Sequence, residues 1–156
     1  MGTFGKAAGS FGAYVACNAE MKEYLINFCA GLIYSTALPP AILGAIDAAL
    51  ELIPSMQGER ARLAMNSKSL REDLISLGFD IRRSSTHIIP IVMESDERAL
   101  KLAQFLQGEG IFAPAIRPPA VPEGSTRIRL SMSAAHTAAH IEQLLESLKK
   151  WTRVHG

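Results

Sequence analysis

The chain has 156 residues, of which 48% are hydrophobic and 20% are charged, and this composition predicts a globular protein with one ordinary core. Lys and Arg number 16 against 15 Asp and Glu, which gives a formal net charge of +1. A charge so close to zero provides no general field for holding nucleic acid or an anionic membrane, so polyanion binding is excluded as the main role.

The cysteines and the apolar segments favour a cytoplasmic protein that is neither secreted nor membrane-bound. The chain opens without the basic leader and apolar core of a signal peptide. Cys17 and Cys29 fit neither a redox CxxC nor a zinc pattern, so we expect buried free thiols. Pro39 and Pro40 interrupt the apolar residues 25–50, which therefore predict two buried segments and no membrane span.

The first third of the chain is expected to contain one strand followed by two helices. The pattern predicts a buried strand over 13–17, a helix over 18–30 that an asparagine caps and Gly31 stops, a loop over 32–38, and a buried helix over 41–53. A lone buried strand needs hydrogen-bonding neighbours, and this sequence shows none. We therefore expect the partners in another chain or, preferably, in a preceding part of a larger protein.

The remainder predicts a connecting helix and a small α/β unit. Leucines at one-turn and two-turn spacing indicate a helix over 58–77, and Gly78 provides a stop. The elements expected after it are strands over 79–82, 87–93, 111–116 and 126–132 and helices over 96–107 and 138–151. Helices on one face of a sheet make an α/β fold. The domains expected are 1–57, the connecting helix 58–78, and 79–156.

Lys6 is the first candidate for chemistry, because glycines and alanines surround it in residues 2–9. Small residues let the backbone approach a bound group closely, and a lysine held in such a place can form a Schiff base with a carbonyl. The alternative is a flexible end with one solvated lysine.

Arginines are the candidate anion ligands. Arg127 and Arg129 alternate with apolar residues on one predicted strand, so both project from the same face. This arrangement is typical of a solvated sheet face, but a guanidinium also binds a carboxylate through two parallel hydrogen bonds. Arg117 precedes two prolines that restrict the backbone, and an ordinary loop arginine is the alternative.

Two polar pairs lie near predicted helix starts. Ser35 and Thr36 could cap the helix that follows or donate hydrogen bonds to a phosphate. His136 and His140 have the spacing of a metalloprotease helix, but Thr137 stands where the catalytic glutamate should be. We therefore expect helix-start or surface histidines and no metal.

Five segments, taken in order, closely resemble the α-oxoamine synthases, which are pyridoxal-phosphate enzymes with the aminotransferase-like fold of type I. The segments are residues 2–9, 34–40, 115–122, 125–130 and 133–137. The resemblance runs from residue 1 to about residue 148. It implies that residues 1–57 end a large cofactor-binding domain and that 79–156 form the small carboxy-terminal domain.

The resemblance also implies roles for individual residues around pyridoxal 5'-phosphate. Lys6 matches the lysine that carries the cofactor and serves as the base for the amino acid's α-proton. Thr3 matches a hydroxyl that holds the cofactor phosphate. Ser35 and Thr36 match a loop that reaches the phosphate of the neighbouring subunit, which implies a homodimer.

The substrate residues of the family match less completely. Arg129 matches the clamp for the substrate carboxylate, and Arg117 matches a substrate-pocket position. Ala120 stands where the usual pattern has threonine, so one expected substrate contact is missing. The segment 115–122 is most similar to the acyltransferase branch that joins L-alanine to a pimeloyl thioester, carried by coenzyme A or a carrier protein, in biotin biosynthesis.

Family members carry a long region before the lysine. That region contains the aromatic residue that stacks on the cofactor ring and the aspartate that pairs with the pyridine nitrogen of the cofactor. We therefore expect this polypeptide alone to be inactive or nearly so. The alternatives are another α-oxoamine synthase, such as glycine C-acetyltransferase, and a non-catalytic α/β structural or dimerisation module.

Overall fold

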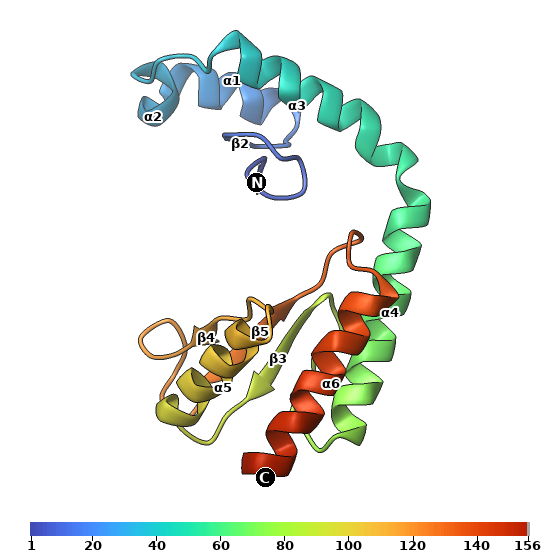
Figure 1. Ribbon diagram of the computed structural model, residues 1–156. Helices are drawn as coiled ribbons and strands as arrows, with labels where there is room; N and C mark the ends of the chain where they lie inside the picture. Colours follow the sequence, from blue (N-terminus) through green and yellow to red (C-terminus); the bar gives the residue numbers. More distant parts are fainter. Residues whose placement is uncertain (156) are drawn as a thin grey trace. The chain divides into compact units, whose positions relative to one another are not determined.

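The computed structural model describes residues 1–155, which fall into two compact units, residues 1–57 and residues 58–155 (Figure 1). The first unit contains β1 (Gly2–Thr3), β2 (Ala13–Tyr14), α1 (Ala19–Phe28), α2 (Ala30–Ile33), α3 (Pro40–Leu52) and the 3-10 turn η1 (Ile53–Ser55). The second contains α4 (Gln57–Ser76), β3 (Ile88–Val92), α5 (Asp96–Gly108), β4 (Ala115–Ile116), β5 (Arg127–Ser131) and α6 (Ala138–His155).

The strand expected over 13–17 is shorter and has a partner within this chain. β2 pairs antiparallel with β1, with Gly2 opposite Tyr14 and Thr3 opposite Ala13. Both residues of β2 are exposed, as are Val15 and Cys17, so the expectation of a buried strand and a buried Cys17 was wrong. A two-stranded ribbon with no third strand beside it has little to bury its faces.

Nearby residues determine where the first two helices begin and end. The Asn18 side chain accepts a hydrogen bond from the Met21 amide at 2.9 Å, which confirms the predicted cap of α1. Gly31 does not stop this helix, because α1 already ends at Phe28 and Gly31 lies inside α2. The loop therefore begins after Ile33, later than expected.

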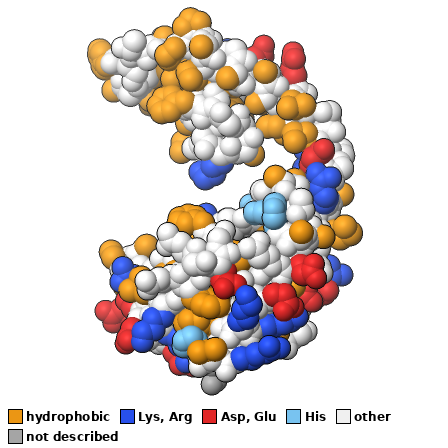
Figure 2. Space-filling model, in the orientation of Figure 1, with side chains coloured by type: hydrophobic (Ala, Val, Ile, Leu, Met, Phe, Trp, Pro, Cys, Tyr) orange, Lys and Arg blue, Asp and Glu red, His pale blue; other side chains and the backbone are white. Residues whose placement is uncertain are grey.

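The first unit leaves its apolar side chains largely uncovered. Of the residues of α3, only Ile46 is buried, although the sequence predicted a helix buried all round. Large hydrophobic side chains that remain exposed include Phe11, Tyr24, Phe28, Leu32, Leu50 and Leu52. Figure 2 shows hydrophobic side chains gathered on the visible surface of this unit. An apolar helix buries only what a neighbouring layer covers, and these few short elements provide no such layer.

The second unit is a small α/β fold, as expected. Its antiparallel sheet has the order β3-β5-β4, with Pro90 opposite Arg129 and Ile116 opposite Arg127. The core forms where three helices meet one face of this sheet. Its fully buried members include Leu70 and Leu74 of α4, Ile89 and Ile91 of β3, Leu102 and Leu106 of α5, Ile128 of β5 and Leu148 of α6.

One predicted strand is absent and another is shortened, each because of a particular residue. Gly78 has φ +86° and ends α4 as predicted, with the Phe79 amide donating to the Leu74 carbonyl at 3.0 Å. Residues 79–82 then form no strand, because the Asp80 carboxylate accepts from the Arg82 amide in a tight turn. In the segment 111–116 only β4 is a strand, since Pro114 has no amide hydrogen to donate to a ladder.

Helices α4 and α6 lie side by side in the second unit (Figure 1). Within residues 1–155, no helix combines the length and hydropathy that crossing a bilayer requires.

A matched pair of leucines on α5 tests the position of the core. Leu102→Ala removes a fully buried side chain and should lower the free energy of unfolding by about 2–5 kcal/mol. Leu100→Ala makes the same change at a side chain that is 46% exposed and should cost within about 0.5 kcal/mol. Urea unfolding followed by the fluorescence of Trp151, which is buried in this core, measures both. Equal costs would contradict the described core.

An ion pair that joins the end of α5 to α6 gives a pH-dependent prediction. The Lys150 ammonium donates to the Glu109 carboxylate at 2.7 Å and holds the pKa of that carboxyl below its usual range. A lowered folded pKa stabilises the fold above the unfolded value, about 4.3, and the contribution disappears as pH falls through the folded pKa.

Lys150→Met should therefore destabilise the chain near neutral pH, and the difference from wild type should shrink in acid. The measurement is urea unfolding between neutral pH and about pH 3. In a Glu109→Gln background most of this pH dependence should disappear, and the remainder belongs to Glu146, whose carboxyl pKa is lowered mainly by Lys149 and to a smaller extent by Lys150. An undiminished pH dependence in that background would assign the titration to a group other than Glu109.

Candidate functional site

Lys6 lies in the loop between β1 and β2, where hydrogen bonds fold the backbone back on itself. The Phe4 amide donates to the Gly12 carbonyl at 2.9 Å, and the Ser10 amide donates to the Phe4 carbonyl at 3.0 Å. Gly9 and Gly12 have φ of +59° and +102°, which side chains with a Cβ rarely adopt. The glycines around Lys6 therefore serve a defined turn.

A close contact fixes the beginning of this loop. A Cβ on Gly2 would lie 2.6 Å from the Tyr14 ring, so any larger residue would displace the ring. Phe4 packs on the same ring, with centroids 5.0 Å apart. The two aromatic contacts hold the strand that carries Thr3 against its partner strand.

The structure brings Lys6 and Thr3 together. The Lys6 amine donates to the Thr3 hydroxyl at 3.5 Å, and both side chains are exposed. A lysine amine can condense with an aldehyde, and a hydroxyl can donate to a phosphate oxygen. This pair therefore offers the two groups that a phosphorylated aldehyde requires.

Ser35 and Thr36 lie in the segment between α2 and α3, in the same unit as Lys6. The Ser35 hydroxyl donates to the Gly31 carbonyl, and the residue that precedes α3 is Pro39, with no side-chain cap. The expectation that these hydroxyls cap α3 was therefore wrong. Both residues are exposed, and nothing places them against Lys6.

The predicted arginine pair projects from the outer face of the sheet, opposite the core. Along β5 the burial alternates, with Ile128 and Leu130 buried and Arg129 exposed. Arg127 donates through Nε to the Ser125 carbonyl at 2.8 Å. Arg127 and Arg129 line one groove of about 630 Å³, which we call the arginine groove. Its other lining residues are Arg82, Arg83, Ser84, Ser85, Thr86, Ile88, Pro90, Ile116 and Val121.

Arg117 and Ala120 lie in the turn after β4 and do not line the arginine groove. The Ala120 amide donates to the Arg117 carbonyl at 2.9 Å, and both residues are exposed. Ile116 and Val121, on either side of this turn, do line the groove. The Arg117 side chain is therefore near the groove in sequence but is not part of its wall.

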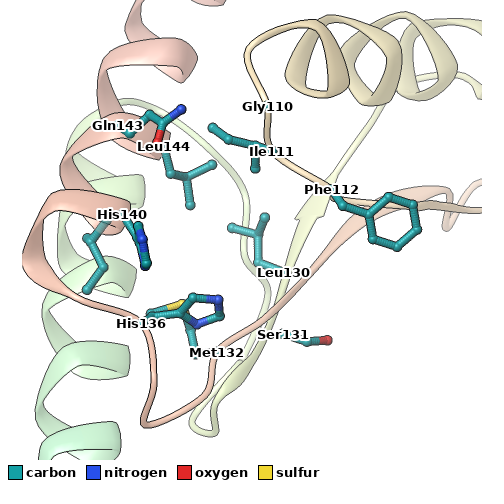
Figure 3. A pocket seen from close by; sticks show the side chains of 11 residues that line it. Gly110, Ile111, Phe112, Leu130, Ser131, Met132, His136, His140, Gln143 and Leu144 are labelled. Atoms are coloured by element: carbon teal, nitrogen blue, oxygen red, sulfur yellow. The ribbon is translucent and has the colours of Figure 1, made fainter.

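His136 and His140 are helix-start histidines, as predicted, and line a second cavity of about 340 Å³ (Figure 3). The Ser133 amide donates to Nδ1 of His136 at 3.0 Å, and the Thr137 amide donates to Nδ1 of His140 at 3.3 Å. A neutral ring whose Nδ1 accepts a hydrogen bond carries its proton on Nε2. Within residues 1–155, no group of three or more His, Cys, Asp or Glu side chains could hold a metal ion.

Arg82 and Arg83 were not identified as site residues from the sequence, although both line the arginine groove. The available signal was the run Arg82-Arg83-Ser84-Ser85-Thr86, which places two guanidiniums before three hydroxyls. The strand expected over 79–82 ended at Arg82, so Arg83 was left outside any predicted element and the run was not considered as a unit.

Comparison with known proteins gives the family. The model of the aminotransferase class I and II family matches residues 1–148. A relative from Gluconacetobacter diazotrophicus, 8-amino-7-oxononanoate synthase, is 47% identical over 100% of this chain and 39% of its own length. The chain spans about two fifths of the length of the curated relatives that it matches.

Solved structures share the fold. A serine palmitoyltransferase structure with PLP superimposes with a TM-score of 0.92 at 28% identity, over 98% of this chain and 39% of that one. The 8-amino-7-oxononanoate synthase of Francisella tularensis superimposes with a TM-score of 0.84 at 29% identity, over 97% of this chain and 44% of that one. These similarities confirm the expected aminotransferase-like fold of type I, and the chain belongs to the aminotransferase class I and II family.

Proposed function

We propose that the chain provides the cofactor lysine and the carboxylate-binding arginine of an α-oxoamine synthase. The observation that carries this proposal is the Lys6 amine beside the Thr3 hydroxyl in a glycine-framed turn. The reaction proposed is the decarboxylative condensation of L-alanine with a pimeloyl thioester to give 8-amino-7-oxononanoate, a step of biotin biosynthesis. Support comes from the relative that carries this name and matches the whole chain. The cofactor is pyridoxal 5'-phosphate and the compartment is the cytoplasm.

The side chains of the Lys6 turn fit this cofactor. Lys6 Nζ would bond to the aldehyde carbon, and the Thr3 hydroxyl would donate to the phosphate. Pyridoxal phosphate, when bound, supplies the electron sink that stabilises a carbanion. Once the amino group of the substrate displaces Lys6 from the aldehyde carbon, the released Nζ would be the base that takes the α-proton of the amino acid. The exposed hydroxyls of Ser35 and Thr36 are assigned to the phosphate of the other subunit in a homodimer.

Arg129 orients the amino acid. Its guanidinium projects from the outer face of the sheet and binds the carboxylate through two parallel hydrogen bonds, which fix the direction of the bond to be broken. Arg117 contacts the substrate from the turn beside the groove. Ala120 has a methyl group where a hydroxyl would donate, so the acyl substrate loses one polar contact there. The acyl donor is pimeloyl-CoA or a pimeloyl carrier protein, and glycine C-acetyltransferase activity is the alternative within the family.

The exposed apolar surface of the first unit favours a second candidate function, a non-catalytic dimerisation module. Side chains such as Phe28, Leu50 and Leu52 are each more than half exposed, and surfaces of this kind bind other protein surfaces. The two candidates differ in whether the cofactor is bound at Lys6.

The cofactor assignment is tested with the chain joined to the part of the Gluconacetobacter protein that it does not cover. With pyridoxal phosphate, the joined protein should show an absorption band that Lys6→Ala abolishes, because no other amine occupies the turn. Borohydride reduction followed by peptide mass spectrometry should place the cofactor on Lys6. Lys22→Ala, at another exposed lysine of the same unit, is the control and should retain the band. No Lys6-dependent adduct in the joined protein would exclude the proposed enzyme and leave the dimerisation module.

Arg129→Gln in the same protein should raise the KM for L-alanine about tenfold or more, because a charge-assisted carboxylate contact is worth about 1.5–3 kcal/mol. Arg129→Lys should restore part of this loss, since it keeps the charge without the paired hydrogen bonds. Arg153→Gln, at an exposed arginine of α6, should leave the KM unchanged. Steady-state kinetics measure all three variants. An unchanged KM in Arg129→Gln would remove Arg129 from the substrate site.

A further inference from the structure

The arginine groove contains more positive charge than one amino acid carboxylate requires. Four guanidiniums line it, and no aspartate or glutamate is among the described residues of its wall. Arg127 is engaged with the Ser125 carbonyl, and Arg129 has the role proposed above. Arg82 and Arg83 are exposed and have no assigned role.

The backbone places these two arginines beside the outer edge of β3. The Val92 amide donates to the Asp80 carbonyl at 2.9 Å, and the Ser84 hydroxyl donates to the Ile88 carbonyl at 2.9 Å. Residues 80–84 therefore run along the edge of β3 that β5 does not occupy. Arg129 lies on the other side of β3, opposite Pro90. The segment that carries Arg83 and the strand that carries Arg129 therefore flank β3 on opposite edges.

The surface between the two cationic positions is apolar. Ile88 and Pro90 project from β3 to the outer face, and both line the groove. Ile88 is 40% exposed, because the alternation along β3 places it on the face opposite the core. An apolar strip with a guanidinium at each side complements a ligand that has two anionic ends and a hydrocarbon middle.

The turn holds its two arginines differently. Asp80 accepts from the Arg82 amide at 2.8 Å and pairs with the Arg82 guanidinium at 3.3 Å, so Arg82 is held in place and partly neutralised. Arg82 also has φ +53°, which is unusual for a residue with a long side chain. Within residues 1–155, no carboxylate forms an ion pair with Arg83. Arg83 is therefore the free cation of this turn.

We propose that Arg83, with Arg82 beside it, binds a second carboxylate, so that the arginine groove accepts a linear dicarboxylate across β3. One carboxylate contacts Arg129, the hydrocarbon chain lies over Ile88 and Pro90, and the far carboxylate contacts Arg83. The same arrangement can be applied to the reaction, and this application rests on the proposed function. Arg129 then holds the amino acid, and Arg83 holds the free carboxylate at the far end of the acyl chain. The groove then selects acyl donors that end in a carboxylate.

Calorimetric titration with heptanedioate and heptanoate tests the proposal, because the two probes share a chain length and differ by one carboxylate. The wild-type chain should bind heptanedioate about tenfold or more tightly than heptanoate. Arg83→Gln should remove this difference and change heptanoate binding little, since Arg129 remains. Arg83→Lys should keep an intermediate preference, and Arg153→Gln, across the fold on α6, should keep the full preference.

Equal affinity of the wild type for both probes would overturn the proposal, as would an undiminished preference in Arg83→Gln. If Arg83→Gln weakens 4'-phosphopantetheine and leaves heptanedioate unchanged, the site takes the phosphate of the thiol carrier and the carboxylate assignment is wrong. Urea unfolding of each variant confirms that the groove is folded. The titration contains no pyridoxal phosphate, so its outcome is independent of whether Lys6 binds the cofactor.

Discussion

The alternation of side chains along β5 is the constraint on which the second unit depends. β5 is the central strand, so it pairs on both edges and cannot shift its register without breaking two ladders. Ile128 and Leu130 face the helices and are buried, and this fixes Arg127 and Arg129 on the other face. A slip by one residue would bury two guanidiniums and expose the core. The burial that stabilises the sheet therefore also determines where the cations of the groove project.

In the first unit, local contacts define the turn around Lys6, but the helices bury little of their apolar surface. Its turn is defined by local contacts, with the Tyr14 ring against Gly2 and Phe4, and Leu38 against Gly12. The Ser10 hydroxyl also donates to the Ile42 carbonyl at 3.4 Å, which ties the turn to α3. Its helices, however, leave most of their apolar area in water, which is costly at about 25 cal/mol per Å². The turn around Lys6 is thus well specified in a unit whose other surfaces require a covering layer.

The sequence predicted most helices correctly for physical reasons that act locally. Capping by Asn18 and the stop at Gly78 depend on a few neighbouring residues, and they were confirmed. Burial depends on what lies across from a residue, and so the burial expected for α3 and Cys17 was wrong. The strand expected over 79–82 failed for a third reason, since the Asp80 side chain competes with the ladder for the Arg82 amide.

The candidate site was only partly visible in the sequence, and the difference lies in tertiary structure. Lys6 and Thr3 are three positions apart, so one turn brings them together and the motif could be interpreted directly. Arg83 and Arg129 are distant in the sequence and meet in one groove only because residues 80–84 run along β3 while β5 pairs with its other edge. No spacing rule in a single sequence contains that information. Because the Lys6 turn lies in the first unit and the arginine groove in the second, the proposed cofactor binding and the proposed anion binding are separable, and a variant at one should leave the other intact.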